Sequence, residues 1–145
     1  MDARQIALEI TETVLVEDTA AAGETLHALQ ELGVKLVLDD FGTGFSSLGY
    51  VKRFPLSFLK IDGSFVADLG RNGRDAAIVS AIAEMARALG ARVVAEGVET
   101  EDQLAGVRKL GCELAQGYLF ARPLPAHKID GLLRTDPWRL ITIRR

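Results

Sequence analysis

Residues 36–47 read Leu-Val-Leu-Asp-Asp-Phe-Gly-Thr-Gly-Phe-Ser-Ser, and no other stretch of the chain is as informative. A short apolar run, typical of a buried strand, ends in two adjacent acids, Asp39 and Asp40. The loop that follows contains Gly42 and Gly44, which can adopt backbone angles that other residues avoid. Two acids at the end of a buried strand are costly unless a cation or hydrogen-bond donors hold them. The stretch therefore favours a metal site; the structural alternative is that Asp40 caps the next helix.

The composition is that of an ordinary soluble domain. The chain has 145 residues, of which 48% are hydrophobic and 26% are charged, enough for one domain with a real core. A net charge of −3, without a Lys/Arg run, argues against partnership with a nucleic acid polymer or direct membrane contact. No apolar stretch is long enough to span a bilayer, and no signal-peptide pattern opens the chain. We expect a cytoplasmic protein, although a larger parent protein could be membrane-anchored.

Cysteine and histidine are too scarce to build the site. The single Cys112 excludes an internal disulfide framework and, after Gly111 in an apolar context, is expected to be buried and inert. His27 and His127 are the only histidines, and both fall in or beside expected helices. A zinc site built from histidine is therefore not expected.

Short apolar runs alternate with longer helical patterns along the chain. The expected strands are Gln5–Ile10, Val34–Asp39, Ser57–Asp62, Arg92–Glu96 and Glu113–Ala115. The expected helices are Asp18–Leu32, Ser47–Phe54, Arg74–Leu89, Thr100–Leu110 and Pro125–Leu133, followed by a tail at Trp138–Arg145. This alternation predicts a parallel sheet with right-handed crossovers, either a barrel or a doubly wound sheet.

The placement of charge within the strands distinguishes between these two folds. Alternate residues of a strand face opposite sides, and here one parity is apolar while the other ends in a charged residue. The charged residues at the carboxyl ends are Glu9, Asp39, Lys60, Asp62 and Glu96. The carboxyl ends of barrel strands converge on one mouth, where barrel enzymes place their chemistry. The pattern therefore predicts a barrel with a converging site.

The length of the chain limits how much of a barrel it can form. A closed eight-unit barrel needs about 250 residues, and this chain offers about five strand–helix units. We therefore expect an α/β fold that is the C-terminal portion of a (β/α)₈ TIM-type barrel. Residues 1–134 would form this partial domain and residues 135–145 a C-terminal tail. Two edge strands and one flank of the core would then be open.

The converging side chains suit a hard divalent cation. The set is rich in carboxylate oxygen and contains one cation: Glu9, Asp39, Asp40, Asp62, Glu96 and Lys60. Mg²⁺ and Mn²⁺ prefer carboxylate and phosphate oxygens, and two such ions about 3.5–4 Å apart clamp a phosphodiester for in-line attack. Lys60 would lower the pKa of an attacking water or neutralise charge on phosphate oxygens. Its structural alternative is a salt bridge to Asp62.

Five motifs, in order, resemble the later motifs of EAL domains, which are bacterial phosphodiesterases that linearise cyclic di-GMP. They are Leu8-Glu-Ile-Thr-Glu12, Asp39-Asp-Phe-Gly-Thr-Gly44, Lys60-Ile-Asp62, Val94-Ala-Glu-Gly-Val-Glu99, and Gln116-Gly-Tyr118 with Pro123. The resemblance runs from about Ile6 to about Leu133. It implies a modified (β/α)₈ barrel, a two-metal site for Mg²⁺ or Mn²⁺, and hydrolysis of cyclic di-GMP to linear pGpG.

The resemblance also implies a role for each matching residue. The metal ligands would be Glu9, Asp39, Asp40 and Glu96, and the catalytic residues would be Lys60 and Glu96. Lys60 would contact the catalytic water, and Glu96 would act as general base or orient that water. The substrate-binding residues at the mouth would be Gln116, Asp62 and Glu99. Glu12 would steady the loop that contains Phe41, Gly42, Thr43 and Gly44, and so favour a homodimer.

One departure from the family pattern limits the expected activity. The Glu-Ala-Leu motif, whose glutamate ligates metal, does not occur in these 145 residues, and neither does the asparagine that follows it. We therefore expect an incomplete metal site and weak or absent hydrolysis. The alternatives are a non-catalytic module that binds cyclic di-GMP or mediates dimerisation, and a half-barrel that associates with a second copy. The resemblance further implies an upstream regulatory or diguanylate-cyclase-like domain in the parent chain.

Overall fold

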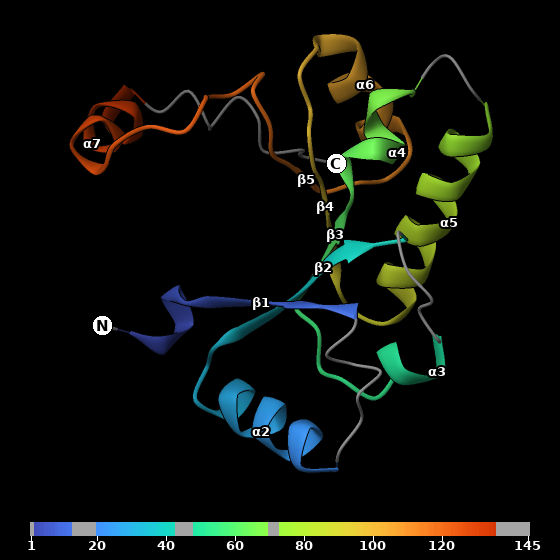
Figure 1. Ribbon diagram of the computed structural model, residues 1–145, viewed down its shortest axis with the longest axis vertical. Helices are drawn as coiled ribbons and strands as arrows, with labels where there is room; N and C mark the ends of the chain where they lie inside the picture. Colours follow the sequence, from blue (N-terminus) through green and yellow to red (C-terminus); the bar gives the residue numbers. More distant parts are fainter. Residues whose placement is uncertain (1, 13–19, 43–47, 70–72, 136–145) are drawn as a thin grey trace.

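The computed structural model describes residues 2–12, 20–42, 48–69 and 73–135 (Figure 1). Its strands are β1 (Ala7–Thr11), β2 (Lys35–Phe41), β3 (Phe58–Ile61), β4 (Arg92–Ala95) and β5 (Leu114–Ala115). They form a parallel sheet in the order β1-β2-β3-β4-β5, so each strand pairs with its neighbour in sequence. This is the arrangement of consecutive βα units in a barrel wall, as predicted.

Helices connect the strands and cover one face of the sheet. They are η1 (Ala3–Gln5), α2 (Ala20–Glu31), α3 (Leu48–Val51), α4 (Gly63–Ala67), α5 (Gly73–Ala88), α6 (Glu101–Lys109) and α7 (Ala126–Thr135). Helix α5 packs on β3 and β4, and α2 packs on β2, whereas α7 lies apart from the sheet at the end of an extended segment (Figure 1). No helix in the described ranges is long and apolar enough to cross a membrane.

The core lies between the sheet and the helices. Leu36, Leu38, Leu59, Ile61 and Val93 are almost completely buried. They belong to the strand parity that the sequence predicts to be apolar, and burial of such side chains is the main force that holds the helices on this face. The opposite parity carries the charged residues, so the packing orients the site side chains toward the other face.

The predicted elements are found with small shifts at their ends. Strand β2 continues to Phe41, two residues past its predicted end, so Asp40 lies in the strand. The described part of the next helix, α3, starts at Leu48, and the alternative in which Asp40 caps that helix concerns residues 43–47, which lie outside the described residues. The sequence interpretation also missed η1 and α4. The predicted tail at Trp138–Arg145 lies outside the described residues.

Candidate functional site

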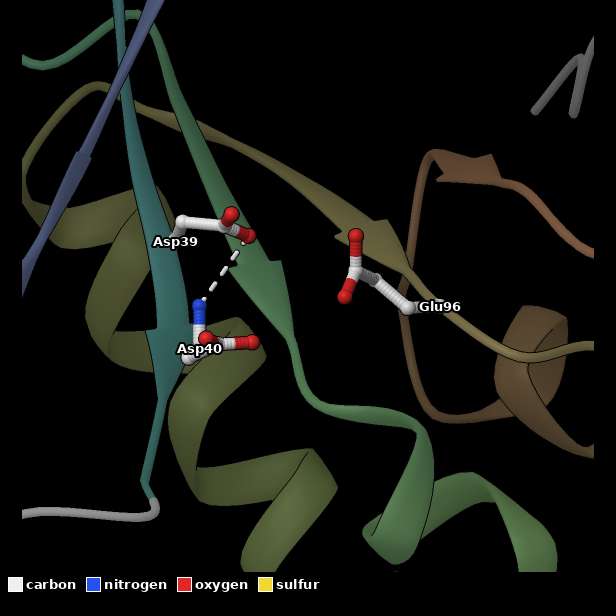
Figure 2. Close-up of side chains that lie close together, drawn as sticks. All are labelled: Asp39, Asp40 and Glu96. Atoms are coloured by element: carbon white, nitrogen blue, oxygen red, sulfur yellow. Dashed lines mark hydrogen bonds between the residues drawn. The ribbon is translucent and has the colours of Figure 1, made fainter.

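The paired acids lie at a distortion near the carboxyl end of β2. The pairing of β2 with β3 shifts register between Leu38 and Phe41, and Asp40 has a φ of 53°, in the left-handed region. Adjacent residues of a regular strand point to opposite faces, but a bulge can turn a side chain toward the other side. One carboxylate oxygen from each of Asp39, Asp40 and Glu96 consequently lies within 4.8 Å of the other two (Figure 2).

Glu96 reaches this cluster from the end of β4. Its amide donates a hydrogen bond to the carbonyl of Ile61 at 3.1 Å, which fixes the backbone beside β3. In Figure 2 the carboxylates of Glu96 and Asp39 face each other across the carboxyl ends of the strands. Gln116 Nε2 donates to Glu96 Oε1 at 2.7 Å, which orients the Glu96 side chain.

Lys60, on β3, joins the carboxylates of three other strands or strand ends. Its Nζ lies 2.6 Å from Glu96 Oε1, 2.7 Å from Asp39 Oδ1 and 3.1 Å from Glu9 Oε2. The residue is only 6% exposed. The alternative salt bridge to Asp62 is not among the contacts of the described residues, because Lys60 pairs with these three acids instead.

The charges in this network alter one another's protonation. Burial acts to lower the pKa of Lys60, but hydrogen bonds to Asp39, Glu96 and Glu9 outweigh burial and raise the pKa above its ordinary value. Burial raises the pKa of Glu96, against the opposing contact with Lys60, and the negative charges of Asp39 and Asp40 add to the rise. Lys60 therefore stays positively charged. The surroundings of Glu96 make its carboxylate easier to protonate than an ordinary glutamate.

Close backbone packing holds the segment that contains Glu96. A Cβ added to Gly97 would lie 3.1 Å from Gly63 Cα, and a Cβ added to Gly117 would overlap the backbone of Val98. The amide of Val98 donates to the carbonyl of Gln116 at 3.0 Å. The sequence interpretation quoted Gly97 and Gly117 within its motifs but gave them no role. Their position directly after Glu96 and Gln116 is the signal that could have identified them.

A pocket of about 640 Å³ opens beside the acidic cluster. Glu96, Glu99 and Gln116 lie in its lining, together with Tyr118 and Arg122, whose guanidinium lies 4.6 Å from the Tyr118 ring centre. The backbone of Glu99 is held by a hydrogen bond to Gln103 Oε1, which belongs to the capping box of α6. Two of the predicted substrate-binding residues, Gln116 and Glu99, therefore share one cavity.

Asp62, the third predicted substrate-binding residue, caps a helix. Its carboxylate accepts hydrogen bonds from the hydroxyl and the amide of Ser64 at the start of α4. The hydroxyl contact is the main cause that lowers the pKa of Asp62. The structure thus gives Asp62 a local role, and its contact with substrate stays a prediction.

Glu12 contacts the predicted loop through the amide of Gly42, which donates to Glu12 Oε1 at 2.9 Å. Glu12 is 8% exposed, and within the described part of the chain its Oε2 is buried without a hydrogen-bond partner. Phe41 is buried in the core. The contact is what a loop-steadying role requires, and the role stays a prediction. Thr43 and Gly44 lie outside the described residues.

The donor set fits a hard divalent cation. Asp39, Asp40 and Glu96 supply carboxylate oxygens close enough to share one ion, and Glu9 is linked to them through Lys60. Carboxylate oxygen is the ligand type that Mg²⁺ and Mn²⁺ prefer. A parallel βα sheet whose strands pair in sequence order and carry such a cluster at their carboxyl ends is the arrangement expected of a barrel wall with an acidic mouth.

The sequence model of the EAL domain matches residues 1–123, so the chain belongs to the EAL domain family. It is 50% identical over 129 residues to the cyclic di-GMP phosphodiesterase NbdA of Pseudomonas aeruginosa, covering 89% of this chain and 16% of NbdA. It is 46% identical over 129 residues to the bifunctional diguanylate cyclase/cyclic di-GMP phosphodiesterase MucR of the same organism, covering 89% of this chain and 19% of MucR.

Solved structures of the family share the fold. The MucR phosphodiesterase in complex with cyclic di-GMP superposes with a TM-score of 0.83 at 46% identity, covering 89% of this chain and 52% of that chain. The manganese and cyclic di-GMP complex of BlrP1 from Klebsiella pneumoniae gives a TM-score of 0.78 at 37% identity. The match covers 85% of this chain and 31% of the BlrP1 chain. The five-stranded sheet is therefore part of a TIM-barrel-like EAL fold. The chain spans about half of the MucR structure, 31% of the BlrP1 structure and 16% of NbdA.

Proposed function

We propose that the chain forms the acidic side of a phosphodiesterase site that hydrolyses cyclic di-GMP to linear pGpG. The observation that carries the proposal is the convergence of Asp39, Asp40 and Glu96 around one potential cation site, with Lys60 bound to their edge. The family relationship supports it, because NbdA is a cyclic di-GMP phosphodiesterase and the MucR structure is a cyclic di-GMP complex.

Divalent ions, Mg²⁺ or Mn²⁺, are the proposed cofactors, in a two-metal arrangement. The manganese in the BlrP1 complex supports this choice, and so does the all-oxygen donor set of this chain. Glu9, Asp39, Asp40 and Glu96 are the proposed ligands. When bound, such ions supply an activated water and stabilise the charge that develops on the phosphodiester.

The remaining residues of the site have proposed roles that follow from their contacts. Lys60 supplies a buried positive charge next to the acidic cluster. We propose that this charge stabilises the negative charge that develops on the phosphate oxygens during hydrolysis. Glu96, whose pKa is raised by burial, can accept a proton from water, and Gln116 holds its carboxylate in place. Glu99 lines the neighbouring pocket and is a proposed substrate contact. Asp62, whose carboxylate accepts from Ser64, is a proposed substrate contact because of the family resemblance.

We also propose that the 145-residue chain by itself is weakly active or inactive, because its sequence contains no Glu-Ala-Leu motif to complete the ligand set. A second candidate function is a non-catalytic module that binds cyclic di-GMP or mediates dimerisation. The pocket of about 640 Å³ beside Gln116 favours it, since a cavity of this size can bind a nucleotide without chemistry. We further propose that the chain forms a homodimer and that it lies in the cytoplasm. The parent protein would carry an upstream regulatory or cyclase-like domain.

A hydrolysis and binding experiment tests these proposals. The purified chain is incubated with cyclic di-GMP and Mn²⁺ or Mg²⁺, and pGpG is measured by chromatography while binding is measured by calorimetry. We expect metal-dependent binding that Asp39→Asn abolishes, and turnover far below that of an intact EAL domain. Lys109→Met, an exposed change on α6, is the matched control and should have no effect. Turnover near that of an intact domain would overturn the proposed weak activity. Cyclic di-GMP binding that is the same without metal and in Asp39→Asn would favour the non-catalytic binding module.

A further inference from the structure

The ammonium of Lys60 is saturated by carboxylates. An ammonium group has three hydrogen-bond donors, and Lys60 faces three acids, Glu9, Asp39 and Glu96, at 2.6–3.1 Å. These acids come from β1, β2 and the end of β4, whereas Lys60 comes from β3, which lies between them in the sheet. One buried cation therefore holds together acids from both sides of its strand.

Two of the carboxylate oxygens that Lys60 contacts each have a second polar contact. Asp39 Oδ1 forms an ion pair with Lys60 and accepts from the amide of Asp40, and Glu96 Oε1 forms an ion pair with Lys60 and accepts from Gln116. Each of these two oxygens therefore already has two polar contacts, one of which is the contact with Lys60. A divalent ion that bound through these oxygens would have to replace contacts that Lys60 now makes.

Charge also places Lys60 in competition with a divalent ion. The carboxylates of Glu9, Asp39, Asp40 and Glu96 outnumber the single ammonium, so the cluster attracts further positive charge. A bound divalent ion would nevertheless lie beside a buried ammonium in a region where charge interactions are stronger than in water. Lys60 thus stabilises the cluster without metal and opposes the entry of metal.

We propose that Lys60 is the internal counter-ion of the acidic cluster, and that a divalent ion binds only by displacing ammonium contacts, so Lys60 sets the affinity of the site for metal. The inference rests on the proposed function insofar as the cluster binds a divalent ion. It goes beyond the proposed contact of Lys60 with water or phosphate, because it concerns the protein before substrate binds.

Removal of the ammonium should therefore tighten metal binding. For Lys60→Met in the full 145-residue chain we expect the dissociation constant for Mn²⁺ to fall by about tenfold or more, given the strength of charge interactions at such distances. The affinity is measured by the electron paramagnetic resonance signal of free Mn²⁺ and by calorimetry, without substrate. Lys60→Gln, also neutral, should behave in the same way.

Two controls separate a local effect from a general one. Lys109→Met, on the exposed side of α6, changes the net charge by the same amount and should leave the Mn²⁺ affinity unchanged. Lys60→Arg keeps the positive charge and should keep the affinity within a few-fold of the wild type. A purely structural role for Lys60 predicts instead that all three substitutions at this position weaken Mn²⁺ binding.

Every outcome of the experiment is informative. Tighter binding by the neutral variants supports the inference, and so does a neutral variant that folds only when Mn²⁺ is added. Equal or weaker binding by folded neutral variants overturns it, while Mn²⁺ binding by the wild type leaves the proposed metal site standing. Neutral variants that stay unfolded with Mn²⁺ overturn it too, because the ion then cannot replace the ammonium. No Mn²⁺ binding by any variant overturns both this inference and the proposed metal site.

Discussion

The backbone amide of Asp40 donates a hydrogen bond to Oδ1 of its neighbour Asp39 at 3.1 Å. The contact forms where Asp40 adopts a positive φ and the pairing of β2 with β3 shifts register. It offsets part of the repulsion between the two acids, since an amide donor stabilises the ionised form of a carboxylate. A local backbone distortion thus places adjacent acids on one side of a strand.

The left-handed conformation of Asp40 predicts which substitutions the position tolerates. Asn adopts positive φ readily, whereas a β-branched residue does so only with strain. We expect Asp40→Val to lower the free energy of unfolding by about 1–2 kcal/mol more than Asp40→Asn does. Urea denaturation followed by circular dichroism measures the difference, with Asp40→Gly as the unstrained control. Equal midpoints for the Val and Asn variants would show that this conformation does not persist in solution.

The hydrogen bond between Glu12 and the amide of Gly42 predicts different effects for two substitutions of Glu12. Glu12→Ala removes the acceptor for the amide of Gly42, and the loss of this hydrogen bond costs about 1–3 kcal/mol. Glu12→Gln keeps a side-chain oxygen in place and should retain most of the stability. Hydrogen exchange at the Gly42 amide gives the direct readout, because protection should be lost only in the Ala variant. Unchanged protection in Glu12→Ala would contradict the contact.

Gly117 should not tolerate a side chain. A Cβ there would overlap the backbone of Val98, which cannot move aside as a flexible side chain can. We expect Gly117→Ala to destabilise the chain by about 1–3 kcal/mol, as overpacking does. Gly131→Ala in α7 is the matched control, because a Cβ at Gly131 meets nothing within 4 Å. If thermal melting showed equal effects for both variants, the close packing around Val98 would be wrong.

Cys112 predicts a pH dependence. The thiol is 1% exposed, and burial, aided by the negative charge of Glu113, raises its pKa from 9.0 to about 12. In the unfolded chain the thiol ionises near pH 9, while in the folded chain it stays protonated until about pH 12. The unfolded state therefore binds fewer protons in this window, so stability falls as the pH rises from 9 to 12.

The comparison of wild type with Cys112→Ala isolates this contribution. The stability of the wild type should fall more steeply than that of the variant between pH 9 and pH 12, in denaturant titrations at each pH. The native thiol should also react slowly with alkylating reagents at pH 8, because the reactive thiolate is scarce. Fast labelling of the folded protein at pH 8 would show that Cys112 is accessible.

The main features of the fold follow from the sequence because buried parallel strands are short apolar runs with clear ends. Alternation along these runs correctly places Leu36, Leu38 and Leu59 in the core and Lys60 on the opposite face. The capping box at Thr100 locates the start of α6 for a similar reason, since its hydrogen bonds are local. Local patterns were sufficient wherever local forces decide the structure.

The geometry of the site depends on contacts that the sequence does not encode locally. Strict alternation would place Asp39 and Asp40 on opposite faces, and the bulge that reverses this arises from pairing with β3. Which acids pair with Lys60 depends on distances across the sheet, so the sequence left Asp62 as an alternative partner. Helix α4 was missed because its five residues are too few to show a helical period. The N-cap formed by Asp62 with the amide of Ser64 is a local pattern that could have indicated it.

The order of the strands has a consequence for biosynthesis. Each strand pairs with its sequence neighbour, so β1, β2 and β3 can assemble while later residues are still being translated. Lys60 can then meet Glu9 and Asp39 before Glu96 has left the ribosome, and Gln116 emerges later still. A nascent chain would therefore hold much of its sheet while its acidic cluster still lacks the carboxylate from β4.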